Sequence, residues 1–329
     1  MIKKRVGVVY GGFTNEKEIS QKSGMTVFKN LDRNTWDVYL IEITETDWKV
    51  TDDAGETYVL SKGDFAFEKD GYRISFDVVF NAVHGAPGEN GQLAALWELQ
   101  GIPHTSSESY LAALTYNKRD CLAVLRPYGI SMATSYALNQ GEAFEVDTIV
   151  EKVGLPCFVK ANRAGSSFGV CKAHTASELP KAIETAFLED TQLIIESALV
   201  GREVSVGAIR GSDEKVEILG ITEIISHNDF FDYAAKYEGQ STEVTPAAIP
   251  KEWEQKINKI VRLIYNKLGL NSLTRSEFII VNDKPHLIEI NTVPGLTEQS
   301  IIPQQVENSG KNLADFFDIL LKNALATKL

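Results

Sequence analysis

The sequence predicts an α/β protein that begins with a parallel-sheet unit and continues into units with antiparallel strands. Two observations support this fold class. Over about the first hundred residues, short β-branched runs such as RVGVVY and FDVVFNAV alternate with stretches of helical periodicity, which is the βα order of a parallel sheet. From about residue 201, longer alternating runs such as REVSVGAI and VEILGITEII indicate antiparallel pairing.

The composition is that of an ordinary globular protein. The chain has 329 residues, enough for two or three domains, of which 43% are hydrophobic and 24% charged. The apolar run near the N-terminus is short and ends in Gly11 and Gly12, so it predicts a first strand rather than a signal peptide. A net charge of -12 argues against nucleic-acid binding, which depends on basic patches. Any phosphate bound by this chain is therefore expected on a small molecule.

The remaining elements follow from periodicity and from helix start and stop signals. A helix follows TNEKEIS, where Asn15 and Glu18 predict a capping box. GQLAALWELQG predicts a second helix, ended by Gly101. One further helix is predicted around SYLAALTYNKRDCLAVLRPYG, with Lys118 at a helix end. The strands LPCFVKA and QLIIES then flank the helix ASELPKAIETAF, and INKIVRLIYNKLG predicts a late helix capped by Gly269.

A predicted hairpin near the C-terminus carries three oxygen-bearing side chains. NDKP separates strands at residues 277–281 and 286–291 and is predicted to be the turn. One register places Glu277 opposite Ile290 and another places it opposite Glu289, so the two carboxylates are neighbours in both. Asn291 shares a face with Glu289 because it lies two residues further along the strand. The alternatives are a magnesium site, in which the cation removes the repulsion between the acids, and a solvated sheet edge.

The loop NRAGSSFGV is the strongest candidate for a phosphate site. It follows the strand that carries Lys160, and its backbone N–H groups, Ser166 and Ser167 can donate to phosphate oxygens. It is not a Walker loop, because GxxxxGK[ST] does not occur in the chain, and a plain hairpin tip is the alternative. His84 lies at the predicted carboxyl end of a strand, where open α/β sheets bind ligands. The missing GxGxxG argues against a dehydrogenase.

The chain resembles the D-alanine:D-alanine ligases in seven strings that occur in the family's order: GGFTNEKEIS, VHGAPGENG, QGIPHT, FVKANRAGSSFGV, GREVSVG, FFDYAAKY and EINTVPGLTEQS. This resemblance implies an ATP-grasp fold with a Rossmann-like N-terminal domain at 1–107, a small lid domain at 108–200 and a metal-binding domain at 201–329. It implies a cytoplasmic enzyme of peptidoglycan and cell-wall synthesis that joins two D-alanines with ATP and two Mg²⁺ ions, with Mn²⁺ as an alternative metal. It also implies a homodimer and no contact with a membrane.

The resemblance implies roles for individual residues. Five are implied in catalysis. Glu18 is implied to meet the ammonium of the first D-alanine, Ser166 and Tyr237 to bond to each other and to Glu18 and so close the lid over the site, and Arg275 and Gly295 to stabilise the oxyanion. Three are implied in binding the D-alanines: His84, Lys236 and Ser300. Five are implied in binding ATP: Lys118, Lys160, Ser167, Glu196 and Glu203. Three are implied in holding Mg²⁺: Glu277, Glu289 and Asn291.

Three positions depart from the family pattern. Glu277 and Asn117 stand where the family commonly has Asp, and Phe231 stands where many members have Tyr. Tyr237 in the lid favours D-alanine as the second substrate, and a D-alanine:D-lactate ligase is the alternative. A nucleotide-binding module without catalysis is a third hypothesis, against which the combination of lysines, acids and Arg275 argues.

Overall fold

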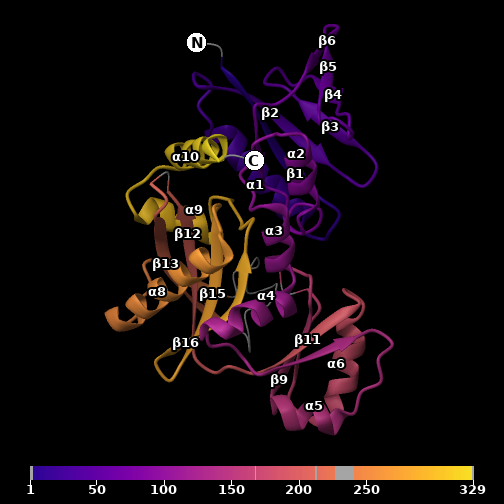
Figure 1. Cartoon of the computed structure of the whole chain (residues 1–329), viewed down its shortest axis with the longest axis vertical. Coiled ribbons are helices and arrows are strands. Elements are labelled where there is room, and N and C mark those ends of the chain that lie inside the picture. The colour runs from indigo at the N-terminus through magenta and orange to yellow at the C-terminus, as the bar shows by residue number, and fades with distance from the viewer. Residues whose placement is uncertain (1–2, 167, 212, 227–240, 328–329) are drawn as a thin grey trace.

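The computed structural model describes residues 3–166, 168–211, 213–226 and 241–327. Ser167, Phe231, Lys236 and Tyr237 lie outside the described residues. Figure 1 shows an N-terminal unit at the top, a small unit that contains α5 and α6 at the lower right, and a C-terminal unit at the left. The candidate site residues come from all three units.

The N-terminal unit is built on a five-stranded sheet in the order β4-β3-β2-β1-β7. β1 pairs in parallel with β2 and with β7, which confirms the predicted parallel arrangement for these strands. β3 and β4 extend the sheet antiparallel on one side. The elements of the unit are β1 (Lys4–Gly11), α1 (Lys17–Asn30), β2 (Trp36–Ile43), β3 (Trp48–Thr51), β4 (Thr57–Val59), β5 (Phe67–Lys69), β6 (Tyr72–Ile74), β7 (Val78–Asn81) and α2 (Gln92–Leu99).

The small unit is a four-stranded antiparallel sheet in the order β10-β9-β11-β8. Its own core is formed by side chains such as Leu138, Ile149, Val159 and Ile183, which are buried between the sheet and its helices. The elements of the unit are β8 (Ser135–Asn139), α5 (Val146–Val153), β9 (Cys157–Ala161), β10 (Val170–Ala173), η2 (Ala176–Glu178), α6 (Leu179–Ala186) and β11 (Gln192–Ser197).

The C-terminal unit is a five-stranded antiparallel sheet in the order β14-β13-β12-β15-β16, as the alternating runs predicted. α8 covers it with the apolar face that contains Ile257, Val261 and Ile264. The elements of the unit are β12 (Arg202–Arg210), β13 (Val216–Ser226), β14 (Ser241–Val244), α8 (Lys251–Leu268), β15 (Thr274–Val281), β16 (Lys284–Asn291), α9 (Ile301–Asn308) and α10 (Leu313–Ala326).

The single helix predicted around residues 108–129 is in fact two helices, α3 (Ser109–Tyr116) and α4 (Lys118–Leu125), followed by the 3-10 turn η1 (Arg126–Tyr128). Asn117 between them is extended, with φ -89° and ψ 98°, and its side chain accepts a hydrogen bond from Asp120 N. An asparagine that caps a new helix competes with continuing the old one, which explains the break. Lys118 is therefore the first residue of a helix, and the prediction that a helix ends at Lys118 is wrong.

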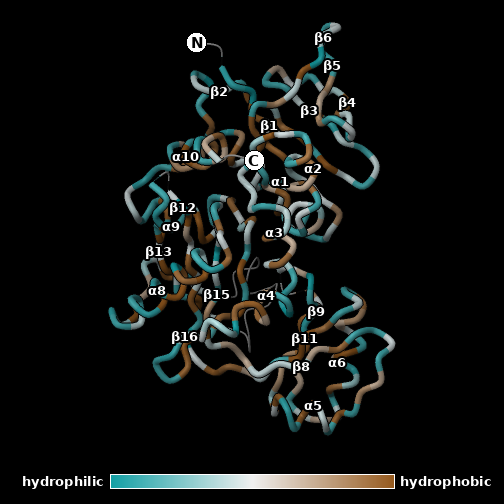
Figure 2. Tube along the Cα trace, in the orientation of Figure 1, coloured by the Kyte–Doolittle hydropathy of each residue, from teal (hydrophilic) through white to brown (hydrophobic). Residues whose placement is uncertain are grey.

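Two helices pack outside the unit that chain order assigns to them. α4 contributes Leu122 and Leu125 to the core of the C-terminal sheet. α10 returns to the N-terminal sheet, where Phe317 meets Phe80 edge-on with ring centroids 5.6 Å apart. In Figure 2 hydrophobic segments follow β1 in the upper, N-terminal unit and β12 and β15 in the C-terminal unit below it. These contacts join the three units around one central region.

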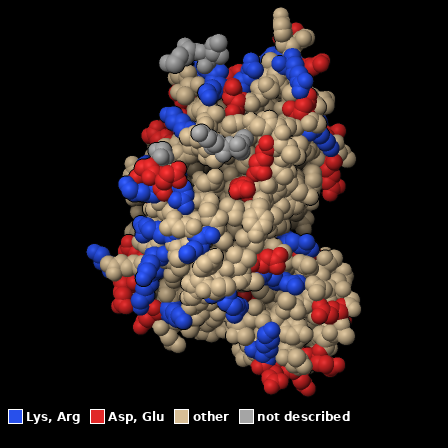
Figure 3. Space-filling model, viewed as in Figure 1, with Lys and Arg blue, Asp and Glu red and all other residues tan. Residues whose placement is uncertain are grey.

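On the face shown in Figure 3, basic and acidic side chains lie interspersed. Among the residues that the structure describes, no helix has the combined length and apolar character required to cross a membrane.

Candidate active site

The acids of the hairpin lie opposite one another. β15 and β16 pair Glu277 with Glu289, because a bulge between Glu277 and Phe278 shifts the register. The turn is shorter than the predicted NDKP: only Asn282 and Asp283 turn, both at positive φ (48° and 61°), which is the conformation of a two-residue hairpin loop. Pro285 lies within β16 and is tolerated there because β16 is the edge strand of its sheet.

Two cations offset the paired carboxylates. Arg275 Nη2 lies 2.7 Å from Glu277 Oε1, and Lys118 Nζ lies 3.2 Å from Glu289 Oε2. The Nδ2 atom of Asn291 is buried without a hydrogen-bond partner among the described residues. No group of three His, Cys, Asp or Glu side chains in the described part of the chain is placed to hold a metal ion. Two carboxylates and one amide therefore fit Mg²⁺ only if further ligands, such as phosphate oxygens, complete its shell.

A second charged pair lines a small pocket beside the hairpin. Lys160 Nζ on β9 donates to Glu196 Oε2 on β11 over 2.9 Å, and Glu196 is only 3% exposed. Burial is the largest influence on the pKa of the Lys160 ammonium and lowers it, but the charge and hydrogen bond of Glu196, together with the charges of Glu289 and Glu203, outweigh burial, so the pKa is raised and the group stays charged. The pocket has a volume of about 120 Å³ and brings together most of the predicted ATP residues: Lys118, Lys160, Glu196 and Glu203, with Glu277 and Glu289 at its side.

A larger cleft of about 1210 Å³ adjoins this pocket and shares Ser166 and Glu289 with it. Gly295 and Ser300 line it from the loop that precedes α9. A side chain at Gly295 would place its Cβ 2.9 Å from Ser300 Oγ, so the Ser300 hydroxyl would have to shift to make room for it. Thus the structure brings Arg275, Gly295, Ser300 and His84 to one cleft, as predicted.

The glutamate that meets Ser166 is Glu16 and not Glu18. Ser166 Oγ donates to Glu16 Oε1 over 2.6 Å, and Glu16 is 9% exposed, whereas Glu18 is exposed on the first turn of α1. Both glutamates line the large cleft, and Glu16 is the one whose carboxylate accepts from Ser166. The predicted capping box is also absent, because the N-cap position is Glu16 and no side chain caps α1. The expectation for Glu18 is corrected to Glu16.

His84 uses both ring nitrogens within the protein. Nδ1 lies 2.8 Å from the carbonyl oxygen of Val293 and must carry the proton, so Nε2 accepts from the hydroxyl of Ser23 at 2.9 Å. Burial lowers the pKa of His84, which keeps the ring neutral. His84 lines the cleft as predicted, but its ring holds the loop that leads to Gly295.

Sequence reasoning missed a second carboxylate in the cleft. Glu89 is 7% exposed, and its Oε2 accepts the N–H of Gly85 over 2.8 Å. Burial, followed by the charge of Glu16, raises the pKa of Glu89 to about 8. The available signal was the acid within VHGAPGENG, a string in which only His84 was assigned a role.

Comparison with known proteins decides the family. Residues 5–107 match the family model described as "D-ala D-ala ligase N-terminus", and residues 124–322 match "D-ala D-ala ligase C-terminus". The chain belongs to the D-alanine–D-alanine ligase family. The ATP-grasp fold predicted from the resemblance is therefore confirmed, with its parallel-containing N-terminal sheet and several antiparallel sheets.

Individual members of the D-alanine–D-alanine ligase family match over almost the whole chain. The D-alanine–D-alanine ligase of Christiangramia forsetii is 49% identical over 99% of this chain and 100% of its own. The crystal structure of D-alanyl-alanine synthetase A from Vibrio cholerae superposes with a TM-score of 0.88 at 26% identity, covering 99% and 100% of the two chains. VanG D-Ala:D-Ser ligase from Enterococcus faecalis superposes with a TM-score of 0.86 at 29% identity, covering 98% and 100%.

Proposed function

We propose that this chain joins two D-alanines to D-alanyl-D-alanine, with ATP converted to ADP and phosphate through a D-alanyl phosphate intermediate. The observation that carries the proposal is the junction of two cavities at Glu289 and Ser166. One cavity holds the lysine and acid pairs suited to ATP, and the other holds the Gly295 and Ser300 loop suited to amino acids. A reaction between an amino-acid carboxylate and a γ-phosphate requires such neighbouring sites.

In the first step the carboxylate of the first D-alanine attacks the γ-phosphate. Lys118 and Lys160 neutralise phosphate charge, while Glu196 and Glu203 bind the adenine and ribose. Arg275 is aligned by its 2.7 Å contact with Glu277, and together with the backbone N–H of Gly295 it stabilises the oxyanion. This positive charge is preorganised, so it costs little to arrange when the transition state forms.

Glu277, Glu289 and Asn291 are the residues that would hold two Mg²⁺ ions, or Mn²⁺, against the ATP phosphates. The bound metal would neutralise the phosphates and align them for in-line transfer. Glu277 is longer by one methylene than the Asp of the family, and the bulge next to it keeps its carboxylate opposite Glu289. Hard oxygen donors of this kind suit Mg²⁺.

In the second step the amine of the second D-alanine displaces phosphate from the acyl phosphate. Ser300, at the N-terminus of α9, binds the carboxylate of this substrate, where helix N–H groups favour an anion. Glu16 holds the ammonium of the first D-alanine and takes the role expected for Glu18. Lys236 binds the same carboxylate as Ser300, Ser167 donates to the ATP phosphates, and Tyr237 closes the lid with Ser166 so that water is kept from the acyl phosphate.

The cellular setting follows from the same proposal. The enzyme works in the cytoplasm as a homodimer and supplies the dipeptide for peptidoglycan, on which the cell wall and cell shape depend. Its three domains, at 1–107, 108–200 and 201–329, contribute the first substrate site, the ATP lid and the metal site.

Phosphate release measured with ATP and Mg²⁺, with and without D-alanine, tests the proposed function. We expect release only with D-alanine, and D-alanyl-D-alanine as the product by mass. Release that does not depend on D-alanine would overturn the proposal. D-lactate and D-serine offered together with D-alanine test the second substrate: a mixed product formed in preference to the dipeptide would favour the alternative, a depsipeptide ligase or a D-serine ligase.

A further inference from the structure

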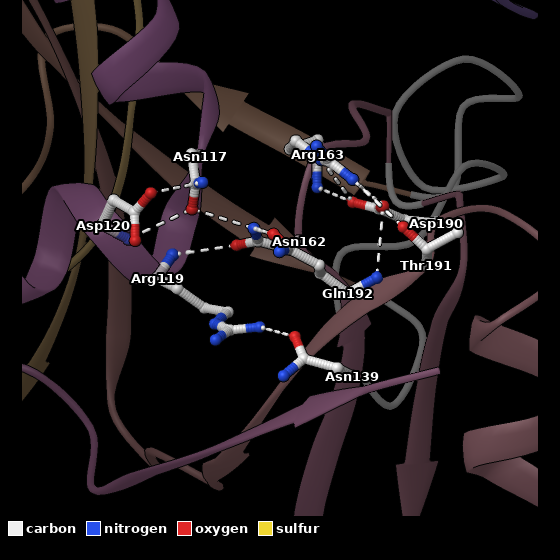
Figure 4. A network of polar contacts seen from close by, with 9 residues as sticks. All are labelled: Asn117, Arg119, Asp120, Asn139, Asn162, Arg163, Asp190, Thr191 and Gln192. Atoms are coloured by element: carbon white, nitrogen blue, oxygen red, sulfur yellow. Dashed lines mark hydrogen bonds and ion pairs between the residues drawn. The ribbon is translucent and has the colours of Figure 1, made fainter. Parts of the chain in front are cut away.

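Asn162 is buried at the joint between the small unit and α4. It is the first residue after β9, which carries Lys160, and it precedes the loop that contains Ser166. Its exposed fraction is 0%. Figure 4 shows its amide between the N-terminal residues of α4 on one side and Gln192 of β11 on the other. A buried amide needs partners for all its polar atoms, and Asn162 has them.

On one side, Asn162 is hydrogen-bonded to the beginning of α4. Its Oδ1 accepts the N–H of Arg119 over 2.9 Å, and its Nδ2 donates to Asn117 Oδ1 over 2.8 Å. Its backbone carbonyl accepts the N–H of Lys118 over 3.3 Å. Three consecutive residues of α4 and its cap are therefore fixed by one residue.

On the other side, Asn162 is fixed to β11. Its N–H donates to the carbonyl of Gln192 over 2.9 Å, and its Nδ2 donates to Gln192 Oε1 over 3.1 Å. The amide thus accepts once and donates twice, and it cannot rotate without placing two oxygens or two N–H groups against each other. The hydrogen bonds fix its orientation as well as its position.

The two lysines proposed to contact the ATP phosphates belong to the elements that Asn162 joins. Lys160 lies two residues before it on β9, and Lys118 begins α4. Lys118 Nζ also donates to the carbonyl of Ala164, two residues beyond Asn162, over 2.7 Å. α4 packs in the core of the C-terminal sheet, whereas β9 belongs to the separate core of the small unit. Their relative placement depends on the contacts between them.

We infer that Asn162, together with Asn117, is a positioning unit that sets the distance between Lys118 and Lys160 and so prepares the site for the phosphates of ATP. The inference rests on the proposed ATP site. Neither asparagine contacts the nucleotide. Both influence ATP binding through the positions of Lys118 and Lys160. Asn117 suits this task because its Oδ1 accepts from Asn162 Nδ2 and, at 3.1 Å, from Asp120 N.

The chain offers a matched control for the cap at Asn117. Asn312 caps α10 in the same way: its Oδ1 accepts from Asp315 N over 2.7 Å, and its Nδ2 donates to Asp315 Oδ2 over 2.6 Å. At Asn117 the corresponding Nδ2 donates to Asp120 Oδ2 over 2.6 Å. Asn312→Ala therefore removes an equivalent cap far from the proposed ATP site, and the difference from Asn117→Ala isolates the bond to Asn162.

The experiment measures ATP affinity by calorimetry with Mg²⁺ and without D-alanine, and then the KM values for ATP and D-alanine. We expect Asn117→Ala and Asn162→Ala to weaken ATP binding roughly tenfold or more, because Asn117→Ala loses the hydrogen bond between the two side chains and Asn162→Ala also loses those to Arg119 and Gln192. KM for D-alanine should change less than about twofold, since these bonds lie on the ATP side. Asn117→Asp keeps the oxygen that accepts from Asn162 but replaces the donation to Asp120 Oδ2 with repulsion between two carboxylates, so its ATP affinity should lie between that of the wild type and that of Asn117→Ala.

Asn312→Ala should lower the thermal midpoint about as much as Asn117→Ala and leave ATP affinity unchanged. Equal ATP affinities for Asn117→Ala and Asn312→Ala would overturn the inference. So would parallel rises in both KM values, which would indicate general loosening of the structure. If Asn162→Ala does not fold, the comparison of Asn117→Ala with Asn312→Ala still tests the inference. Because nucleotide binding needs no turnover, a wild-type protein that binds ATP without ligating D-alanine would refute the proposed function and leave this test standing.

Discussion

Ser23 donates a hydrogen bond of 2.9 Å to His84 Nε2, and this bond ties α1 to the loop that carries Gly295. The same hydroxyl accepts the N–H of Leu296 over 3.1 Å, while His84 Nδ1 holds the carbonyl of Val293. Both sides of Gly295 are therefore anchored through this pair. Accurate placement of an oxyanion donor matters because its stabilising energy depends on distance and direction.

Ser23→Ala should lower kcat roughly tenfold and leave ATP affinity unchanged, because the loop loses both contacts while the nucleotide pocket keeps its residues. Steady-state kinetics together with ATP calorimetry measure this. Ser20→Ala is the matched control, since Ser20 is also fully buried on α1 and makes two hydrogen bonds, from Gly11 N (2.8 Å) and to Ala82 O (2.7 Å). Equal losses of kcat in the two variants would contradict a specific role for Ser23.

The glutamates of α1 should differ sharply in their effect on activity. Glu16→Gln should lower kcat/KM for D-alanine roughly a hundredfold, because the buried carboxylate that meets Ser166 loses its charge opposite the substrate ammonium. Glu18→Gln, a change of the same chemistry on the exposed side of the helix, should keep kcat/KM within about twofold. The opposite ranking of the two variants would restore the original expectation for Glu18.

Glu277→Gln should lower Mg²⁺-dependent turnover by roughly two orders of magnitude or more. The amide is a weaker ligand for Mg²⁺, and the contact that aligns Arg275 changes as well. Glu277→Asp keeps the charge and restores the shorter side chain common in the family, so it should recover most of the rate. Titration of the rate with Mg²⁺ at fixed ATP, and direct binding of Mg²⁺ with ADP, measure the effect. An unchanged rate in Glu277→Gln would refute its role.

Glu89 should make stability depend on pH. Burial and the charge of Glu16 raise its pKa to about 8 in the folded protein, so folding favours the protonated carboxyl. The stabilisation is complete below the usual carboxyl pKa of about 4.5 and is lost as pH rises towards 8, because the unfolded chain releases the proton first. The side chain of the Glu89→Gln variant cannot ionise. Between pH 5 and pH 8 the denaturant midpoint of the variant, relative to that of the wild type, should therefore rise. Parallel midpoints across this range would show that Glu89 is not held protonated.

Local patterns predicted the hairpin because its side chains alternate with a period of two. That period placed Glu289 and Asn291 on one face of the strand, independently of the register in which the partner strand pairs with it. It left the position of Glu277 open between two registers. A bulge leaves no clear pattern in the sequence, yet it shifts every later residue pair of the hairpin by one residue. The break at Asn117 was hidden for a similar reason: apolar periodicity continues through α3 and α4, and only the capping hydrogen bond separates them.

The sequence by itself determined the βα order of the N-terminal unit and the antiparallel C-terminal sheet, and it placed Glu277, Glu289 and Asn291 on one predicted hairpin. These follow from periodicity and from motifs in fixed order, both of which are local properties of the chain. Only the tertiary structure decided that Glu16 meets Ser166, that His84 binds Ser23 and the Val293 carbonyl, and that Asn162 joins α4 to β9. The physical reason is that a buried polar group takes whichever partner packing brings within hydrogen-bond distance, and for Ser23 and Leu296 that partner lies 273 residues away in the chain.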